Sequence, residues 1–305
     1  VGGIPPRRDA VTAVGFEHPV TVLRRYHLTA KKSWGQNFLV SEGAVRALTE
    51  CCVPSPGTRV IEIGAGLGTL TGALLGAGAS VVAVERDRDM CAVLEGEFGD
   101  HPGFTLCAAD AATFDFDHPP GGIADVIAGN LPYQITGAIL RRIMDCTPPP
   151  AKAVFMVQEE VATRICAGVD DRERAALSVM LDGRFSASIV LRLKPTAFFP
   201  APKVRSPVVA LTPRHPSLLA DLAPRHFDIL VKSAFATRRK TIRNSFLHSG
   251  FAPPEKVDAL LAVCGIDPTV RAEKLATGAF IALTREATRA GLFSGAAGTP
   301  EAGAG

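Results

Sequence analysis

The chain has 305 residues, of which 47% are hydrophobic and 21% are charged, with a formal net charge of +3. This balance is typical of a globular protein, and no apolar run approaches the roughly 18 residues of a membrane span. The seven cysteines show no Cys-x-x-Cys spacing, and the seven histidines are scattered. We therefore expect a cytoplasmic protein with reduced thiols, no signal peptide, no membrane association and no metal site.

Basic residues are concentrated in two stretches, although the chain as a whole is close to neutral. Residues 1–34 carry six Arg and Lys against two acids, and residues 225–243 carry six against one. Such clusters indicate a polyanionic partner such as RNA. A solvated face would give the same pattern, so either cluster alone leaves both readings open.

Short apolar runs alternate with helical patterns through most of the chain, in the order expected for a parallel sheet covered on both faces. Strands are predicted at residues 59–63, 80–84, 104–108, 124–128 and 153–157. Helices are predicted at residues 45–52, 70–75, 90–98, 135–144 and 159–167. Two further β-rich runs, residues 187–193 and 208–211, are predicted to form an antiparallel hairpin at the sheet edge. The predicted fold class is α/β with a mostly parallel sheet.

The two ends of the chain differ from this pattern. Residues 1–28 show no periodicity and are expected to form a flexible basic arm. After Pro213 no strand pattern remains, and helices are predicted at residues 227–236, 240–246, 255–263 and 276–288. We therefore predict an α/β domain over residues 29–213, a small all-helical domain over residues 214–290 and a disordered tail over residues 291–305.

The most informative motif is a glycine-rich turn after the first predicted strand. Gly64, Gly66 and Gly68 let a ligand approach the backbone closely, but alone they would suit NAD, FAD or S-adenosylmethionine. The spacing lacks the G-x-G-x-x-G of dinucleotide folds, and Glu62 would repel a pyrophosphate. S-adenosylmethionine instead carries an ammonium and a sulfonium, which suit an acid beside the loop. The motif therefore predicts S-adenosylmethionine as cofactor.

Acidic side chains follow the next two predicted strands. Glu85 is expected to accept hydrogen bonds from the ribose hydroxyls, and Asp110 from the adenine amino group. Because the carboxyl ends of parallel strands share one edge of a sheet, both acids should lie beside the glycine turn. The residues that follow them, Arg86 and Ala111, are predicted to contact the cofactor as well.

Residues 129–133, with the sequence GNLPY, follow the fourth predicted strand and are similar to the Asn-Pro-Pro-Tyr motif of methyltransferases that modify base amino groups. The Asn130 side-chain oxygen and the Leu131 carbonyl are expected to accept the two amino hydrogens and to stabilise the positive charge that develops on the nitrogen. Pro132 fixes the turn, and Tyr133 offers an aromatic face to a flipped-out base.

A second aromatic segment, residues 198–204, is rich in proline. Phe198 is predicted to sandwich the base against Tyr133, whereas Phe199 is as readily explained as a core aromatic. No general base is required before methyl transfer to an amino group, so we expect no catalytic His or Cys.

From about residue 29 to residue 283 the chain resembles the ribosomal RNA adenine dimethyltransferases of the KsgA type. The matching segments are KKSWGQNFL at residues 31–39, FFPAPKVRS at residues 198–206 and FATRRKTIRN at residues 235–244. The last of these is the most specific, because it lies in the helical region and accounts for the second basic cluster. The resemblance implies a Rossmann-like class I methyltransferase domain followed by the helical domain.

The resemblance also implies roles for individual residues. Asn37 and Leu39 would close over the cofactor, and Gln36 would also contact it. RNA would be bound by basic residues of the two later segments, namely Lys203, Arg238, Arg239, Lys240 and Arg243. Helical spacing is expected to put Arg239 and Arg243 on one face, available to phosphates.

The implied reaction is dimethylation of N6 on two adjacent adenosines in the 3′-terminal hairpin loop of small-subunit rRNA. The resemblance further implies a cytoplasmic monomer that acts on the immature small subunit during its biogenesis, and a link to kasugamycin sensitivity. Two alternatives stay open: a large-subunit rRNA adenine methyltransferase of the resistance type, and a non-catalytic RNA-binding, assembly or transcription factor derived from this fold. Residues 238–244 argue against the first, and the intact residues 64–68 and 130–133 against the second.

Overall fold

The structure is a computed structural model that describes residues 15–31, 35–132 and 134–293. The chain divides into two compact units. The first, the sheet unit, comprises Val1–Ala162 and Ala187–Pro213, and the second, the helical unit, comprises Thr163–Ser186 and Arg214–Gly305. The sheet unit ends at residue 213, where the α/β domain was predicted to end, but Thr163–Ser186, predicted as part of that domain, lies in the helical unit.

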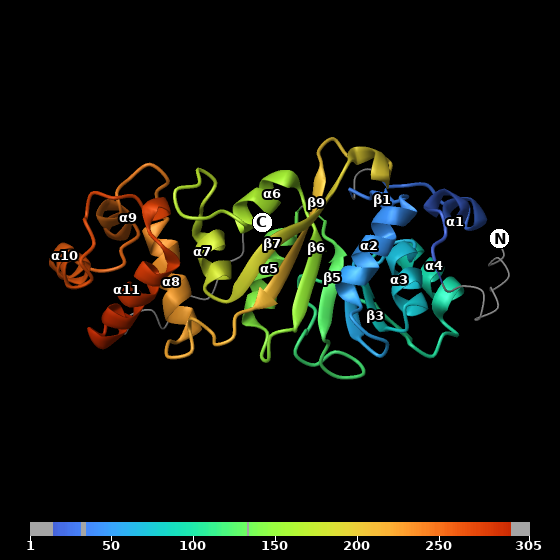
Figure 1. Ribbon diagram of the computed structural model, residues 1–305, viewed down its shortest axis with the longest axis horizontal. Coiled ribbons are helices and arrows are strands. Elements are labelled where there is room, and N and C mark those ends of the chain that lie inside the picture. Colours follow the sequence, from blue (N-terminus) through green and yellow to red (C-terminus); the bar gives the residue numbers. More distant parts are fainter. Residues whose placement is uncertain (1–14, 32–34, 133, 294–305) are drawn as a thin grey trace. The chain divides into compact units, whose positions relative to one another are not determined.

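The sheet unit is built on a seven-stranded sheet with the order β4-β3-β2-β5-β6-β9-β7 (Figure 1). The strands are β2 Arg59–Ile63, β3 Ser80–Glu85, β4 Phe104–Ala108, β5 Val126–Asn130, β6 Lys152–Met156, β7 Phe185–Leu193 and β9 Ser206–Pro213. The pairings from β4 to β6 are all parallel, and β9 is antiparallel to β6. The predicted α/β class with a mostly parallel sheet is confirmed, and β9 and β7 are neighbours at its edge. Because β2 lies between β3 and β5, the strand order reverses at this strand.

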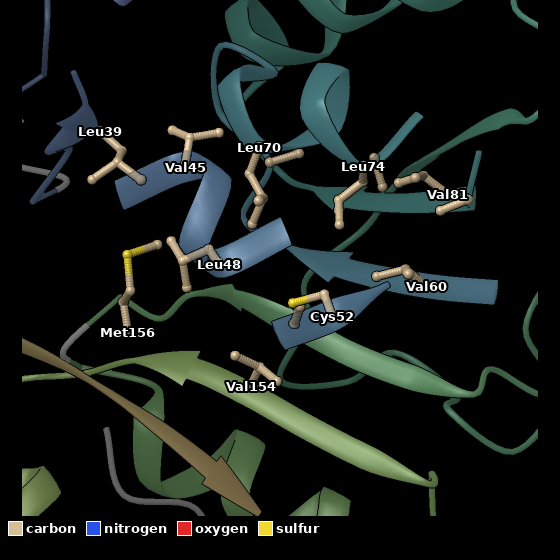
Figure 2. Packing of buried hydrophobic residues seen from close by; sticks show 14 of the residues in the cluster. Leu39, Val45, Leu48, Cys52, Val60, Leu70, Leu74, Val81, Val154 and Met156 are labelled. Carbon is tan, nitrogen blue, oxygen red and sulfur yellow. The ribbon is translucent and has the colours of Figure 1, made fainter. Parts of the chain in front are cut away.

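The helices of the sheet unit cover this sheet with apolar side chains, which most of them carry on one face. They are α2 Glu42–Cys52, α3 Thr69–Gly76, α4 Arg88–Phe98, α5 Thr136–Asp145 and, across the division between the units, α6 Glu159–Ile165. In α2 the buried side chains recur at helical spacing. Figure 2 shows Leu48 and Cys52 on the side of the strand residues Met156 and Val154, and Val45 on the side of Leu39 and Leu70. This packing fixes α2 against β5 and β6, beside the edge where the predicted site lies.

Part of the region predicted to be a flexible arm is folded. Helix α1, Pro19–Arg25, has proline at its first position and buries Val22 and Leu23. Arg25 donates to Glu97 of α4 over 2.7 Å. The prediction was wrong for this stretch because a seven-residue helix is too short to show a clear period. The first 14 residues of the expected arm lie outside the described part of the chain.

The helical unit confirms the helices predicted after residue 213. Its helices are α7 Ala176–Asp182, α8 Pro224–Ala234, α9 Ile242–His248, α10 Pro254–Val263 and α11 Thr277–Arg289. Its core is aromatic, with Phe227, Phe246 and Phe280 fully buried. Among the described residues, no helix of either unit has the length and apolar character needed to cross a membrane.

A buried arginine explains why Thr163–Ser186 belongs to the helical unit. Arg174 is 6% exposed and donates to the carbonyls of Ala167 and Leu275 and to the hydroxyl of Thr277. The bonds to Leu275 and Thr277 join residues that are 101 and 103 positions apart, so the pattern of the neighbouring sequence does not predict them.

The predicted disordered tail begins too early. Phe293 is buried and stacks on His226, with ring centroids 4.1 Å apart. The chain from residue 291 to residue 293 is therefore part of the helical unit, because an aromatic side chain anchors it. The remainder of the predicted tail, residues 294–305, lies outside the described residues.

Candidate active site

A cavity of about 410 Å³ lies in the sheet unit at the carboxyl ends of β2, β3 and β5. This is the edge where the strand order reverses, which is where open α/β sheets bind ligands. The lining contains every residue predicted to bind the cofactor: Gln36, Asn37, Leu39, Glu62, Gly64, Gly66, Glu85, Arg86, Asp110, Ala111 and Asn130. Leu131 and Pro132 line it as well, while Tyr133 lies outside the described residues.

The glycine loop, residues 64–68, forms one wall of the cavity. Gly64, Gly66 and Gly68 all have left-handed backbone conformations, with φ of 68°, 57° and 78°. A Cβ at Gly66 would lie 3.3 Å from the Phe38 ring, and one at Gly68 would lie only 2.3 Å from the ring of Phe98. Both conformation and space therefore require glycine at Gly68. The loop turns tightly and leads directly into α3.

Glu62 is the buried acid of this wall. It is 2% exposed, and Oε2 accepts a hydrogen bond from the Thr71 hydroxyl over 2.6 Å. Burial raises the pKa of Glu62 to about 8, although the Thr71 bond acts in the opposite direction. No cation among the described residues pairs with this carboxyl group. A positively charged ligand group in the cavity would favour the ionised form, so the residue suits an ammonium.

Glu85 links the glycine loop to the loop after β3. Its Oε2 accepts from the Gly66 N–H over 3.0 Å, and its Oε1 accepts from the N–H groups of Arg86 and Asp87, each over 2.9 Å. The carboxylate is 9% exposed and is held rigidly at the cavity wall. Because a carboxylate oxygen can accept two hydrogen bonds, Oε2 retains capacity for a donor on a ligand.

Asp110 is held at the end of the same wall. Oδ1 accepts from the Ala112 N–H over 2.9 Å, and Oδ2 accepts from the Arg86 guanidinium over 3.0 Å. These bonds lower the pKa of Asp110, the backbone bond most strongly, so the group is ionised at neutral pH. The side chain therefore presents acceptor atoms to the cavity, with Arg86 beside it.

Asn130 ends β5 and is anchored by the segment at residues 36–39, here named the QNFL segment. Its Nδ2 donates to the Asn37 carbonyl over 3.0 Å. This bond fixes the orientation of the amide group, and Oδ1 is the atom of the side chain that can accept from a substrate. The next residue, Leu131, donates its N–H to the Met156 carbonyl over 3.1 Å. The Pro132 carbonyl accepts from Thr136 Oγ1 over 3.1 Å, which fixes the turn.

Asp87 is a site residue that the sequence reasoning missed. It is 2% exposed, and its two carboxylate oxygens accept from Lys31 Nζ over 2.7 and 2.9 Å. Its Oδ2 also accepts from Gln36 Nε2 over 2.8 Å, and its Oδ1 caps α4 by accepting from the Asp89 N–H. An Asp before a helix is a recognisable cap. Nothing in the sequence, however, indicates its partners more than 50 residues earlier.

The predicted stacking role of Phe198 is not supported by its position. Strand β1, Phe38–Leu39, pairs antiparallel with β8, Phe198–Phe199, with Leu39 opposite Phe198. Alternate side chains of a strand point to opposite faces, and Phe198 points into the core. It is 4% exposed and does not line the cavity, whereas Phe199 is 43% exposed. Phe198 is therefore a core aromatic, and Phe199, for which a core role had stayed open, is the exposed one of the two.

The predicted RNA-binding residues of the helical unit do not share a helix face. Helix α8 ends at Ala234 and α9 begins at Ile242, because Thr241 caps α9 by accepting from the Asn244 N–H. The exposed side chains of residues 238–240 lie in the turn between these helices. Arg243 lies in α9 and binds Asp258 through bonds of 2.6 and 2.9 Å. The expected alignment of Arg239 with Arg243 is therefore wrong.

Lys203 belongs to the sheet unit, in the loop between β8 and β9. Its side chain is exposed, as an RNA-binding residue requires. Within the described chain it forms no ion pair. The structure thus separates the predicted RNA-binding residues into one loop of the sheet unit and one turn, with the start of α9, in the helical unit.

Comparison with known proteins shows the family to which the chain belongs. The sequence profile of the family described as "Ribosomal RNA adenine dimethylase" matches residues 27–289. The chain is 42% identical to "Ribosomal RNA small subunit methyltransferase A" of Anaeromyxobacter dehalogenans (strain 2CP-C), over 88% of this chain and 98% of that protein. The protein of the same name from Myxococcus xanthus (strain DK1622) is 40% identical, over 88% and 95%.

Two solved structures share the fold. A dimethyladenosine transferase from Plasmodium falciparum superposes with a TM-score of 0.72 at 24% identity, covering 83% of this chain and 98% of that one. The 23S rRNA methyltransferase ErmE superposes with a TM-score of 0.63 at 26% identity, covering 82% and 98%. Both support the class I methyltransferase fold. With the profile matched over most of its length, the chain belongs to the ribosomal RNA adenine dimethylase family.

Proposed function

We propose that this enzyme uses S-adenosylmethionine to dimethylate N6 of two adjacent adenosines in the 3′-terminal hairpin loop of small-subunit rRNA. The observation that carries the proposal is the Asn130 amide, anchored by the QNFL segment at the edge of a cavity built by the glycine loop. The small subunit is favoured because relatives named for it are 40–42% identical, whereas the 23S rRNA enzyme is 26% identical. The protein would act as a monomer in the cytoplasm, on the immature small subunit.

The cavity has the chemistry that S-adenosylmethionine requires. Glu62 suits the ammonium, because it is a buried acid without a protein cation. Glu85 retains acceptor capacity for the ribose hydroxyls, and Asp110 presents acceptors for the adenine amino group. When bound, S-adenosylmethionine supplies an electrophilic methyl group on a positively charged sulfur. Arg86, Ala111, Gln36, Asn37 and Leu39 would complete the contacts.

Asn130 and Leu131 would act on the acceptor base. The lone pair of an adenine amino nitrogen is delocalised into the ring, so the nitrogen is a weak nucleophile. Asn130 Oδ1 and the Leu131 carbonyl would accept its two hydrogens, which aims the lone pair away from them and stabilises positive charge on the nitrogen. Tyr133 remains the predicted stacking partner of the base.

Asp87 would act as a positioning residue for this arrangement. It binds Lys31, which precedes the QNFL segment, and Gln36, which is the first residue of the segment. The next residue, Asn37, carries the carbonyl that binds the Asn130 amide. A charge-assisted contact to a buried carboxylate is stronger than a neutral one. The same carboxylate caps α4, so one side chain would set the position of both the cofactor wall and the catalytic amide.

The decisive experiment is methylation of small ribosomal subunits that lack the modification, with labelled S-adenosylmethionine and mapping of the modified bases. We expect label at two adjacent adenosines of the terminal hairpin, and none in large subunits assayed in parallel. Label confined to the large subunit would establish the large-subunit alternative. Calorimetry without detectable S-adenosylmethionine binding, even with RNA present, would instead favour a non-catalytic RNA-binding factor.

A further inference from the structure

Phe199 is a large aromatic side chain that the fold leaves exposed beside the cavity. It is 43% exposed, and the antiparallel register pairs it with Phe38. Directly opposed residues of two antiparallel strands lie on the same face, with Cβ atoms about 5 Å apart. Because Phe38 lines the cavity, Phe199 lies next to the cavity wall on its solvent side.

The loop that follows, residues 200–205, exposes a second apolar side chain between two cations. Val204 is 42% exposed, and Lys203 and Arg205 on either side of it are also exposed. Of the seven large hydrophobic side chains that the described residues expose, Phe199 and Val204 are the two that lie within six residues of each other, and Phe199 is the single aromatic. Two prolines in the loop restrict its backbone, so little conformational entropy is lost when it binds a ligand.

The sequence around Phe199 and Val204 carries only positive charges. Residues 183–220 contain six Arg and Lys and no Asp or Glu. Three of the six pair with acids from other segments: Arg184, Arg192 and Arg214. Lys203 and Arg205 form no ion pair or side-chain hydrogen bond within the described chain. The exposed apolar surface is thus flanked by two cations that are available to an anionic partner.

We propose that Phe199 and Val204, with Lys203 and Arg205, form a stacking platform for an unpaired nucleotide next to the methyl-accepting adenosine. The inference rests on the proposed function, because it assumes an RNA substrate. An adenosine that is drawn out of its stack leaves its neighbour without a stacking partner, and an aromatic face replaces that contact regardless of base identity. The two cations would neutralise the adjoining phosphates.

The test measures methylation kinetics on small subunits that lack the modification, and S-adenosylmethionine affinity, for three variants. Phe199→Ala is expected to raise the KM for the small subunit about tenfold. Its kcat and its Kd for S-adenosylmethionine should stay within about twofold of the wild type, because Phe199 does not line the cavity. Phe199→Trp keeps an aromatic face and is expected to keep the wild-type KM.

The matched control is Ile123→Ala. Ile123 is 47% exposed and precedes β5, so it lies near the amino end of that strand, whereas the cavity lies at the carboxyl ends. Its replacement should leave the KM unchanged. An unchanged KM in Phe199→Ala, or an equal rise in Phe199→Trp, would overturn the platform while the proposed function stands. A wild-type enzyme that methylates no RNA would overturn both.

The cations have a separate readout in the salt dependence of RNA binding. Lys203→Gln and Arg205→Gln are each expected to reduce the slope of log affinity against log salt by about 0.7, as for loss of one phosphate contact on a single strand. The probe is a synthetic RNA hairpin with the terminal-loop sequence, labelled with a fluorophore, without S-adenosylmethionine. If both variants keep the wild-type slope, Lys203 and Arg205 do not contact phosphates and that part of the proposal is wrong.

Discussion

The glycine loop and the QNFL segment form neighbouring parts of one cavity, but they are held in place in different ways. The glycine loop is fixed by its own backbone, because three left-handed glycines turn the chain within five residues. The QNFL segment is fixed from outside, by Asp87, by β8 and by the Asn130 amide. A local motif therefore specifies the first wall, whereas the second exists only once distant segments have come together.

This difference separates two kinds of failure. A substitution in the glycine loop should act on the fold itself, because the backbone conformation is lost. A substitution among the partners of the QNFL segment should leave the fold intact and lower the rate of methyl transfer, because the bonds that are lost position the groups that we propose to be catalytic. Substitutions in each of the two regions, with matched controls, distinguish these outcomes.

The largest effect is expected from Asn130→Ala. The variant loses both the proposed acceptor oxygen and the amide that binds the Asn37 carbonyl, so methyl transfer should fall about 100- to 1,000-fold. Its Kd for S-adenosylmethionine should change little, because most of the proposed cofactor contacts come from other residues. Single-turnover methylation and calorimetry measure the two quantities separately. Unchanged label incorporation would exclude the role given to Asn130.

The next effect tests the glycine loop. Gly68→Ala places a Cβ 2.3 Å from the Phe98 ring, at a φ of 78° that alanine adopts poorly. We expect the free energy of unfolding to fall by about 2–4 kcal/mol, from the left-handed backbone and the overpacked core together. The control is Gly43→Ala in α2, where a Cβ meets nothing within 4 Å and helix propensity should add about 0.5 kcal/mol. Urea denaturation measures both, and an equal response at the two positions would contradict the comparison.

The same difference explains what the sequence could predict. The glycine spacing, Glu62, Glu85 and Asp110 could be located because strand ends and turns are local features, and parallel strands bring their carboxyl ends to one edge. The pairing of β1 with β8 joins residues about 160 positions apart, so the burial of Phe198 and the exposure of Phe199 could not be deduced.

Other errors have the same origin. The helix α1 was missed because seven residues show no clear period and its apolar side chains pack against Met90 and Val93 of α4. The expected alignment of Arg239 with Arg243 was wrong because propensity alone does not reveal the cap at Thr241. Gly129 was read only as part of a motif. Its Cβ would lie 2.3 Å from the Ile63 carbonyl oxygen, so glycine is required where β5 passes β2. The sequence located the residue types of the candidate site, whereas tertiary contacts determine which of their side chains face the cavity.

A smaller effect tests how the QNFL segment is held. In Asp87→Asn the helix cap is retained, since Asn caps as well as Asp, but the charged contact to Lys31 is lost. We expect wild-type stability, a kcat about tenfold lower and a few-fold weaker Kd for S-adenosylmethionine. Lys31→Met should give a similar loss, and the double variant should lose little more, because both changes break one contact.

Asp89→Asn is the matched control for this clamp. Asp89 also contacts Lys31, over 2.7 Å, but it is 47% exposed and no hydrogen bond joins it to Gln36 in the described structure. Solvent-exposed ion pairs contribute little, so its kcat should stay within about twofold of the wild type. If Asp89→Asn and Asp87→Asn have equal effects, or if the two changes at Asp87 and Lys31 are additive, Asp87 is a helix cap and no more.

The last test concerns the pH dependence of stability that the buried Glu62 carboxyl imposes beside the glycine loop. Its pKa of about 8 lies above the ordinary value of 4.5, because burial disfavours the charged form. Between these pH values the folded protein holds a proton that the unfolded chain releases. The contribution of Glu62 to stability is therefore complete below pH 4.5, and it is lost as the pH rises through about 8.

Glu62→Gln removes this titration, so its free energy of unfolding should fall less than that of the wild type between about pH 5 and pH 8.5. Urea denaturation across this range measures the difference. The variant should also bind S-adenosylmethionine more weakly at pH 8, because a neutral amide cannot pair with an ammonium. The two readouts therefore move in opposite directions at high pH, with a more stable fold and a weaker site. Parallel curves of unfolding free energy against pH for the variant and the wild type would show that Glu62 does not titrate in this range. The predicted pH dependence would then be wrong.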